Sequence, residues 1–191
     1  MKLRLLLLKI LLILSINYTF ANNEEIQHWE KQALEGDHKA QANLGYIYLN
    51  GWKTIKKDYK KAFNWYTKAA NGNVFAAQNN LGHMYEHGYG VRQNLETALI
   101  WYKKAADQND MNGQYNAGVL LIEKIDDSPE NRREGLKYLI KSKKLGNFSA
   151  EFIIGKTYIV HNIKISDGPQ NLKEAISWIE NAANKGNKKA I

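Results

Sequence analysis

Two short sequence motifs alternate along most of this chain, each returning after 36 to 40 residues. We call their copies the first-family segments (residues 43–51, 80–88, 116–124 and 153–161) and the second-family segments (residues 65–72, 101–109, 138–146 and 178–186). A period of this size is typical of repeat architectures, in which each repeat is one supersecondary unit that stacks on its neighbours. The chain is therefore predicted to contain four repeats of similar structure.

Both kinds of segment have the apolar spacing of an α-helix. In the second repeat Ala77, Leu81 and Met84 fall on one helical stripe, and Ala98, Trp101 and Tyr102 fall on another. Residues suited to an N-cap precede every second-family segment: Asp58, Asn94, Ser128 and Asn171. Glycines that can take a left-handed backbone follow three of them: Gly72, Gly146 and Gly186. These signals predict an all-α chain of helix pairs.

One glycine recurs beside the first-family anchor residue in every repeat. A glycine inside a helix costs about 1 kcal/mol relative to alanine, so its recurrence needs a reason. The four positions are Gly45, Gly82, Gly118 and Gly155. We expect the two helices of each pair to approach closely there, with the large Trp and Tyr side chains of the second-family segments filling the space beside the contact.

The pattern resembles the Sel1-like repeat, a helix-pair relative of the tetratricopeptide repeat. The second repeat carries it best, with Leu81-Gly82, the GYGV loop at residues 88–91, and Trp101-Tyr102 followed by Ala105-Ala106. The first repeat departs in its loop, and the third and fourth lack that loop. The resemblance implies a right-handed α/α solenoid with repeats at about 37–72, 73–108, 109–146 and 147–186. It also implies a concave face lined by the first-family helices.

The N-terminal residues have the composition of a secretory signal. A basic start at Lys2 and Arg4 precedes an apolar run over residues 5–16, and cleavage is expected after Ala21. The alternative is an uncleaved anchor, but the run is shorter than the roughly 20 residues of a membrane span. Residues 22–36 are predicted to form a capping helix before the repeat domain of residues 37–191. The mature protein is then periplasmic or secreted, with no stable membrane span.

Charge and residue types argue against nucleic-acid binding and against catalysis. The net charge of +8 is spread over scattered lysines, and the cluster at residues 53–61 reads as a solvated face, so no nucleic-acid partner is predicted. The chain has no cysteine, which removes thiol nucleophiles and a disulfide framework. We therefore predict a non-enzymatic protein with no catalytic residue and no cofactor.

One string resembles a catalytic motif. The sequence from His83 through Glu86 to His87 fits H-x-x-E-H, which places two histidines one helical turn apart. A catalytic zinc needs a third protein ligand, and the repeat pattern supplies none. The string is interpreted as two surface histidines and no metal site is predicted. The alternative is a weak hydrolase, either zinc-dependent through His83 and His87 or similar to a β-lactamase.

The predicted binding surface lies on the concave face, because extended concave surfaces are where repeat proteins bind. Residues of the first-family segments that fall outside the core positions are the candidates for protein binding: Tyr46, His83, Glu86, Tyr115, Val119, Ile122, Phe152 and Lys156. The alternative is that the irregular third and fourth repeats bury Tyr115, Val119 and Phe152 in the core.

These features predict an adaptor that binds a protein partner, whose identity the sequence does not give. By resemblance the roles open to it are envelope assembly, host interaction or virulence, and immunity against an antibacterial phospholipase effector. Residues 186–191 resemble the opening of a further repeat, so the C-terminal end is also a candidate for self-association.

Overall fold

The computed structural model describes residues 24–53, 55–126, 128–163 and 166–186. The expected signal peptide and residues 187–191 lie outside these ranges. Regular structure in the described ranges is helical, apart from one isolated bridge between Trp52 and Ile55. The prediction of an all-α helical-repeat fold is confirmed.

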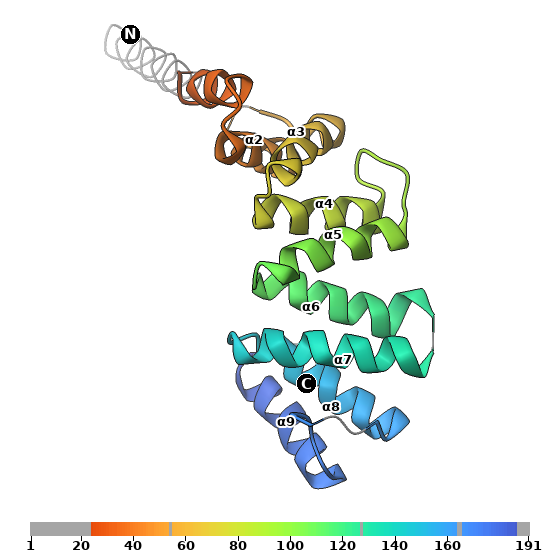
Figure 1. Ribbon diagram of the computed structural model, residues 1–191. Coiled ribbons are helices and arrows are strands. Elements are labelled where there is room, and N and C mark those ends of the chain that lie inside the picture. The colour runs from red at the N-terminus through yellow and green to blue at the C-terminus, as the bar shows by residue number, and fades with distance from the viewer. Residues whose placement is uncertain (1–23, 54, 127, 164–165, 187–191) are drawn as a thin grey trace, which may run out of the picture. The chain divides into compact units, whose positions relative to one another are not determined.

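The helices follow one another in the order that the two families of segments predict (Figure 1). Residues 24–34 are helical and precede the first repeat. The first-family segments form α2 (His38–Asn50), α4 (Phe75–His87), α6 (Met111–Leu120) and α8 (Ser149–His161). The second-family segments form α3 (Tyr59–Asn71), α5 (Leu95–Asp107), α7 (Pro129–Lys144) and α9 (Leu172–Asn184). A π-helical turn, η1 (Leu121–Ile125), continues α6.

The chain divides into two compact units after Ala77. In the first unit α2 and α3 pack as a pair, with the helix of residues 24–34 before them. Its core consists of Ala33, Ala40, Leu44 and Ile47, and Trp29, Ile55 and Trp65 cover this core from its edge.

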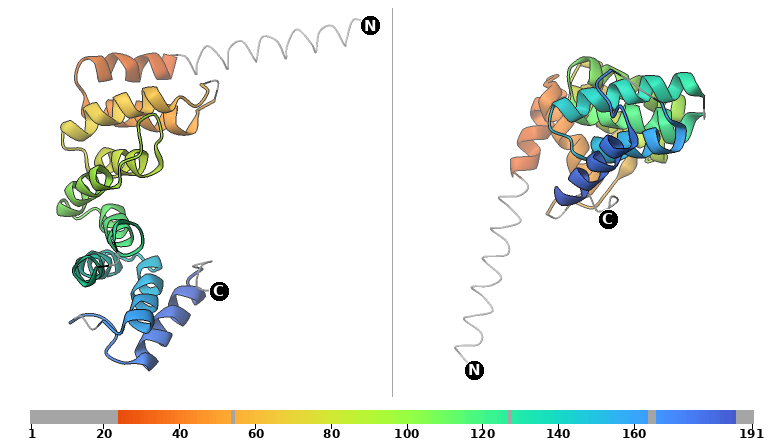
Figure 2. Two further views of the ribbon diagram at one scale, coloured as in Figure 1. Left: turned by 90° about the vertical axis from the view of Figure 1, so that its right-hand side faces the viewer. Right: turned by 90° about the horizontal axis from the view of Figure 1, so that it is seen from below.

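The second unit contains two apolar clusters. One is built on Ala98, Tyr102, Ala117 and Leu120, and the other on Leu136, Leu139, Ile140, Ala150, Ile153 and Ile154. The second cluster joins α7 to α8, and α8 in turn packs against α9, as Figure 2 shows. Since Gly155 meets Ala175 and Glu151 meets Asn181, α8 and α9 run antiparallel.

The predicted N-caps are confirmed in all four second-family helices. Asp58, Asn94, Ser128 and Asn171 each accept a hydrogen bond from a backbone N–H three residues later. The left-handed glycines are confirmed at Gly146 and Gly186 (φ of 100° and 87°). The prediction for Gly72 is wrong, because its φ is −78° and the following Asn73 takes the positive φ of 62°.

The cap of α9 is the most complete of these. Asn171 accepts from the Glu174 N–H at 2.9 Å, and the Glu174 carboxylate accepts from the Gln170 N–H at 2.8 Å. We expect Asn171→Ala to lower the free energy of unfolding by about 1 kcal/mol. Amide hydrogen exchange in α9 should quicken, while Lys173→Ala, an exposed change in the same turn, should leave it as it was. Unaltered exchange in Asn171→Ala would contradict the role of this cap.

Each repeat glycine lies where its helix touches the partner helix, as predicted. A Cβ built on Gly45 would be 2.6 Å from the Tyr66 ring, and one on Gly82 would be 2.7 Å from the Tyr102 ring. Gly118 lies against Leu139 and the Gly135 carbonyl, and Gly155 lies against the Ala175 carbonyl. The contacts are too close for any side chain, which explains why glycine is retained inside these helices.

The fully buried aromatic residue in the first two repeats is the tyrosine that follows the tryptophan. Tyr66 and Tyr102 are almost completely buried. Trp65 and Trp101 are only half-buried, and a lysine one turn later covers each ring at 4.4 Å and 4.0 Å from its centroid. The tryptophans therefore form the outer edge of each helix pair.

A polar residue is buried at one position of every first-family helix. Three repeats have glutamine there (Gln41, Gln78 and Gln114) and the fourth has Glu151. Gln41 donates to the Ala33 carbonyl, and Gln114 reaches the Ala106 carbonyl. In both cases a side-chain amide satisfies a carbonyl near the end of the preceding helix, where the helix itself leaves carbonyls unbonded.

Candidate functional site

The predicted binding residues lie on first-family helices in both units. Tyr46 is on α2 in the first unit, with 54% of its surface exposed. The other seven are in the second unit, on α4, α6, η1 and α8.

Four of these residues form an apolar border between the core and the surface. Tyr115, Val119, Ile122 and Phe152 are half-buried and pack against the cluster of α7 and α8. Burial raises the pKa of the Tyr115 hydroxyl, and the nearby Glu123 carboxylate raises it further. The alternative that these side chains are buried in the core is therefore true in part, since each packs against the core and still reaches the surface, and protein binding by them stays a prediction.

Two hollows flank this border. One, of about 430 Å³, lies between η1 and α8 and is lined by Ile122, Glu123, Lys156, Thr157, Val160 and His161. The other, of about 500 Å³, lies where α6 and α8 begin, and Tyr115 and Phe148 are among its lining residues. We call the apolar border together with these hollows the α6–α8 surface.

The most exposed apolar side chain of this surface lies at the end of α8, where Val160 is 63% exposed. The sequence prediction missed Val160 and Glu123. Val160 could have been found as an apolar residue near the end of the last first-family segment, residues 153–161.

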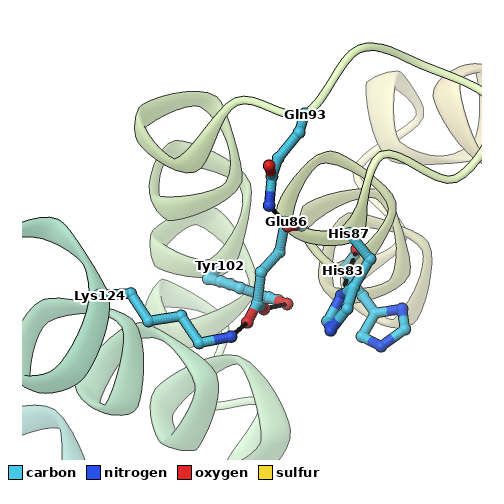
Figure 3. Close-up of polar contacts among 6 residues, drawn as sticks. All are labelled: His83, Glu86, His87, Gln93, Tyr102 and Lys124. Carbon is cyan, nitrogen blue, oxygen red and sulfur yellow. Dashed lines mark hydrogen bonds and ion pairs between the residues drawn. The ribbon is translucent and has the colours of Figure 1, made fainter.

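The charged residues of the predicted surface are paired within the chain. The Glu86 carboxylate accepts hydrogen bonds from the Tyr102 hydroxyl at 2.6 Å and from the Lys124 ammonium at 2.5 Å (Figure 3). Lys156 donates to Glu123 at 3.0 Å. Two ion pairs thus connect α4 to η1 and η1 to α8, and they include both Glu86 and Lys156.

The π-helical turn η1 supplies one residue to each of these two ion pairs. The first-family helices of the first two repeats end five residues after their repeat glycine, at Asn50 and His87, whereas α6 continues through η1 to Ile125, seven residues after Gly118. The η1 turn carries both Glu123 and Lys124, and Lys124 lies beyond the repeat position at which α2 and α4 end. Turns of this kind are rare and occur frequently at functional sites.

The environment of Glu86 keeps its carboxylate charged. Burial raises the pKa of Glu86, but the hydrogen bonds from Lys124 and Tyr102 and the positive charge nearby outweigh burial and lower the pKa overall. Burial raises the pKa of the Tyr102 hydroxyl, and its hydrogen bond to the charged Glu86 carboxylate raises it further.

The H-x-x-E-H string does not form a three-residue site. The His83 and His87 rings lie side by side with centroids 4.2 Å apart, and the Glu86 carboxylate points away from them toward Tyr102 and Lys124 (Figure 3). Within the described residues no group of three or more His, Asp or Glu side chains is placed to hold a metal ion. Glu86 is therefore not oriented as the general base of a zinc hydrolase.

None of the helices in the described ranges has both the length and the apolar character needed to cross a membrane.

Comparisons with known proteins agree with the repeat geometry. The Sel1 repeat family matches residues 38–74, 75–110, 112–147 and 166–187. The chitin synthase regulator SKT5 of Saccharomyces cerevisiae is 41% identical over 74 residues, which cover 38% of this chain and 11% of that protein.

Two solved structures are similar over 86% of this chain. A Sel1 repeat protein from Oxalobacter formigenes has a TM-score of 0.73 and 29% identity, with 63% of its length covered. A protective antigen of uropathogenic Escherichia coli strains has a TM-score of 0.72 and 30% identity, with 34% covered. The chain therefore spans about a ninth of the yeast regulator and less than two thirds of either solved structure. Three of the matched stretches each cover a helix pair and the fourth covers α9, and these four matches place this chain in the Sel1 repeat family, whose members are protein-interaction scaffolds.

Proposed function

We propose that this chain is an exported bacterial scaffold that binds a protein partner on the α6–α8 surface and catalyses no reaction of its own. The observation that carries the proposal is the exposed apolar end of α8, where Val160 lies on the rim of the hollow between η1 and α8. Apolar side chains beside a concavity are where binding energy tends to concentrate in protein interfaces. Family membership supports the class of function, since Sel1 repeats mediate protein–protein binding.

Export is the part of the proposal that rests on sequence. The basic and apolar composition of residues 1–21 supports it, and so does the likeness to an antigen of uropathogenic Escherichia coli. Host interaction is therefore the role that we favour, ahead of envelope assembly or immunity. Mass spectrometry of the protein recovered from periplasm and culture medium tests export directly. Absence of the chain from both fractions would contradict export, and recovery of the chain with residues 1–21 still attached would contradict cleavage after Ala21.

Binding at the α6–α8 surface is tested by crosslinking. With a photo-reactive amino acid at position 160, we expect an adduct with a partner protein, and Val160→Arg should abolish capture of that partner because it places a charge in an apolar contact. The matched control is Ile100, which is 55% exposed on α5, a second-family helix. Ile100→Arg should leave capture unchanged. Equal capture by Val160→Arg and the parent chain would show that the partner binds elsewhere.

A further inference from the structure

We propose that His83 and His87 together form a non-catalytic binding site for a Cu²⁺ ion on the surface of α4. This site is independent of partner binding at the α6–α8 surface. It differs from the zinc hydrolase considered from the sequence, because it uses two ligands and leaves Glu86 out.

The first support is the position of the two rings. Residues four apart lie on the same face of a helix, and the two imidazoles are in contact, with centroids 4.2 Å apart and planes tilted by 35°. His87 is exposed and His83 is half-buried, so an ion reaches them from solvent. The terminal ring torsion of histidine is broad, so the His83 ring can turn until one of its nitrogens faces the Nε2 side of His87, whose own ring is held by a hydrogen bond to the His83 carbonyl.

The second support is a hydrogen bond that prepares His87 as a ligand. Its Nδ1 lies 3.0 Å from the His83 carbonyl oxygen, an acceptor, so Nδ1 carries the proton. The lone pair of Nε2 is then free for a metal. Histidines that bind metals nearly always donate their other ring N–H in this way, which fixes the tautomer and the ring orientation.

The third support is that the Glu86 carboxylate of the H-x-x-E-H string lies away from the two rings. The Glu86 carboxylate is held by Tyr102 and Lys124 on the side away from the rings (Figure 3). Tyr89 closes another side, with its ring stacked on His87 at 5.4 Å between centroids. The protein therefore offers two nitrogen donors, and the remaining coordination positions are left to water.

This donor set selects copper. Structural zinc sites use four protein ligands and catalytic ones use three, which the described residues do not bring together here. Cu²⁺ binds nitrogen donors more tightly than the other divalent ions of the first transition series, and it accepts tetragonal sites completed by water.

The test is calorimetric titration of the untagged mature chain with a copper(II) salt, together with electron paramagnetic resonance of the bound ion. We expect one Cu²⁺ per chain above the background of the N-terminal amine, with hyperfine coupling to imidazole nitrogens. Because outer-shell partners of a metal already contribute 10–100-fold to affinity, loss of a ligand in His83→Ala or His87→Ala should raise the Kd at least about tenfold. His161→Ala, which removes an isolated histidine, should leave the Kd unchanged.

Three results would overturn the proposal. Parent-like affinity in the His83→Ala/His87→Ala double variant would place the ion elsewhere. A large loss in Glu86→Gln would mean that the carboxylate is a ligand, and tighter binding of zinc than of copper would contradict the two-nitrogen site. If circular dichroism shows that His83→Ala is unfolded, His87→Ala alone decides, since that side chain is exposed.

Discussion

Tyr102→Phe is expected to lower the free energy of unfolding by about 1.5–3 kcal/mol, whereas Tyr66→Phe is expected to leave it unchanged or raise it slightly. The two tyrosines occupy the same repeat position, and both rings lie against a repeat glycine. Only the hydrogen bonding of their hydroxyl groups differs. The Tyr102 hydroxyl donates to the charged Glu86 carboxylate at 2.6 Å, while within the described residues the buried Tyr66 hydroxyl has no hydrogen-bond partner.

The physical reason is the cost of leaving a buried polar group unpaired. Removing the Tyr102 hydroxyl breaks a hydrogen bond to a charged group, which is among the stronger kinds. Removing the Tyr66 hydroxyl instead deletes a group that lost its water on folding and gained nothing in return. Each variant is therefore the control for the other, because both keep the aromatic ring and its contact with glycine.

Urea unfolding followed by circular dichroism measures the difference. Repeat proteins need not unfold in one step, so hydrogen exchange of α3 and α5 should be measured as well. We expect faster exchange in α5 of Tyr102→Phe and no change in α3 of Tyr66→Phe. Equal destabilisation by the two variants would mean that the bond to Glu86 contributes nothing.

Gly118→Val is expected to cost about 3 kcal/mol, at the upper end of what overpacking typically costs. A Cβ at Gly118 would lie 2.7 Å from a Leu139 side-chain carbon and 2.8 Å from the Gly135 carbonyl oxygen. Gly135 faces the same restriction, since its own Cβ would lie 2.8 Å from the Gly118 carbonyl oxygen. A side chain can turn away from an intruding group, but a backbone carbonyl inside a helix cannot, so α6 and α7 would have to separate.

The control for this variant is Ala76→Val, an exposed position of α4. It introduces the same side chain into a helix without a close neighbour, and should cost only the lower helix propensity of valine, less than about 0.7 kcal/mol. Thermal and urea unfolding of the two variants gives the comparison. If Gly118→Val is no less stable than Ala76→Val, the contact between the glycines does not limit the packing of α6 on α7.

The helix pairs, their caps and the close approach at Gly45, Gly82, Gly118 and Gly155 could be predicted, because each depends on local spacing that repeats along the chain. Which of two neighbouring aromatic residues is the buried one could not be predicted. Trp65 and Tyr66 both fall within the apolar stripe, and only the room beside Gly45 shows that the tyrosine is the buried one. The left-handed residue after α3 was misassigned for a related reason, since glycine and asparagine both tolerate that backbone and they stand side by side.

The candidate site could be predicted in its apolar part and less well in its charged part. Tyr115 and Phe152 follow from their positions in the repeat. The pairing of Glu86 with Lys124 does not, because it joins residues 38 apart and Lys124 lies in the π-helical turn, which the other first-family helices lack. Sequence spacing gives the direction in which a side chain leaves a helix, but it does not give the partner that a long lysine reaches.

Glu151 limits the order in which the repeats of this protein can be arranged. Gln41 and Gln114 each connect their helix pair to the helix that precedes it through an amide N–H, which a carboxylate lacks. Glu151 instead accepts from Asn181 within its own pair and lies 3.8 Å from the Lys143 ammonium of α7. The fourth repeat is therefore suited to follow a repeat that supplies a cation, as α7 supplies Lys143. An artificial array should therefore be built from copies of the second or third repeat, with the fourth repeat placed directly after a third repeat.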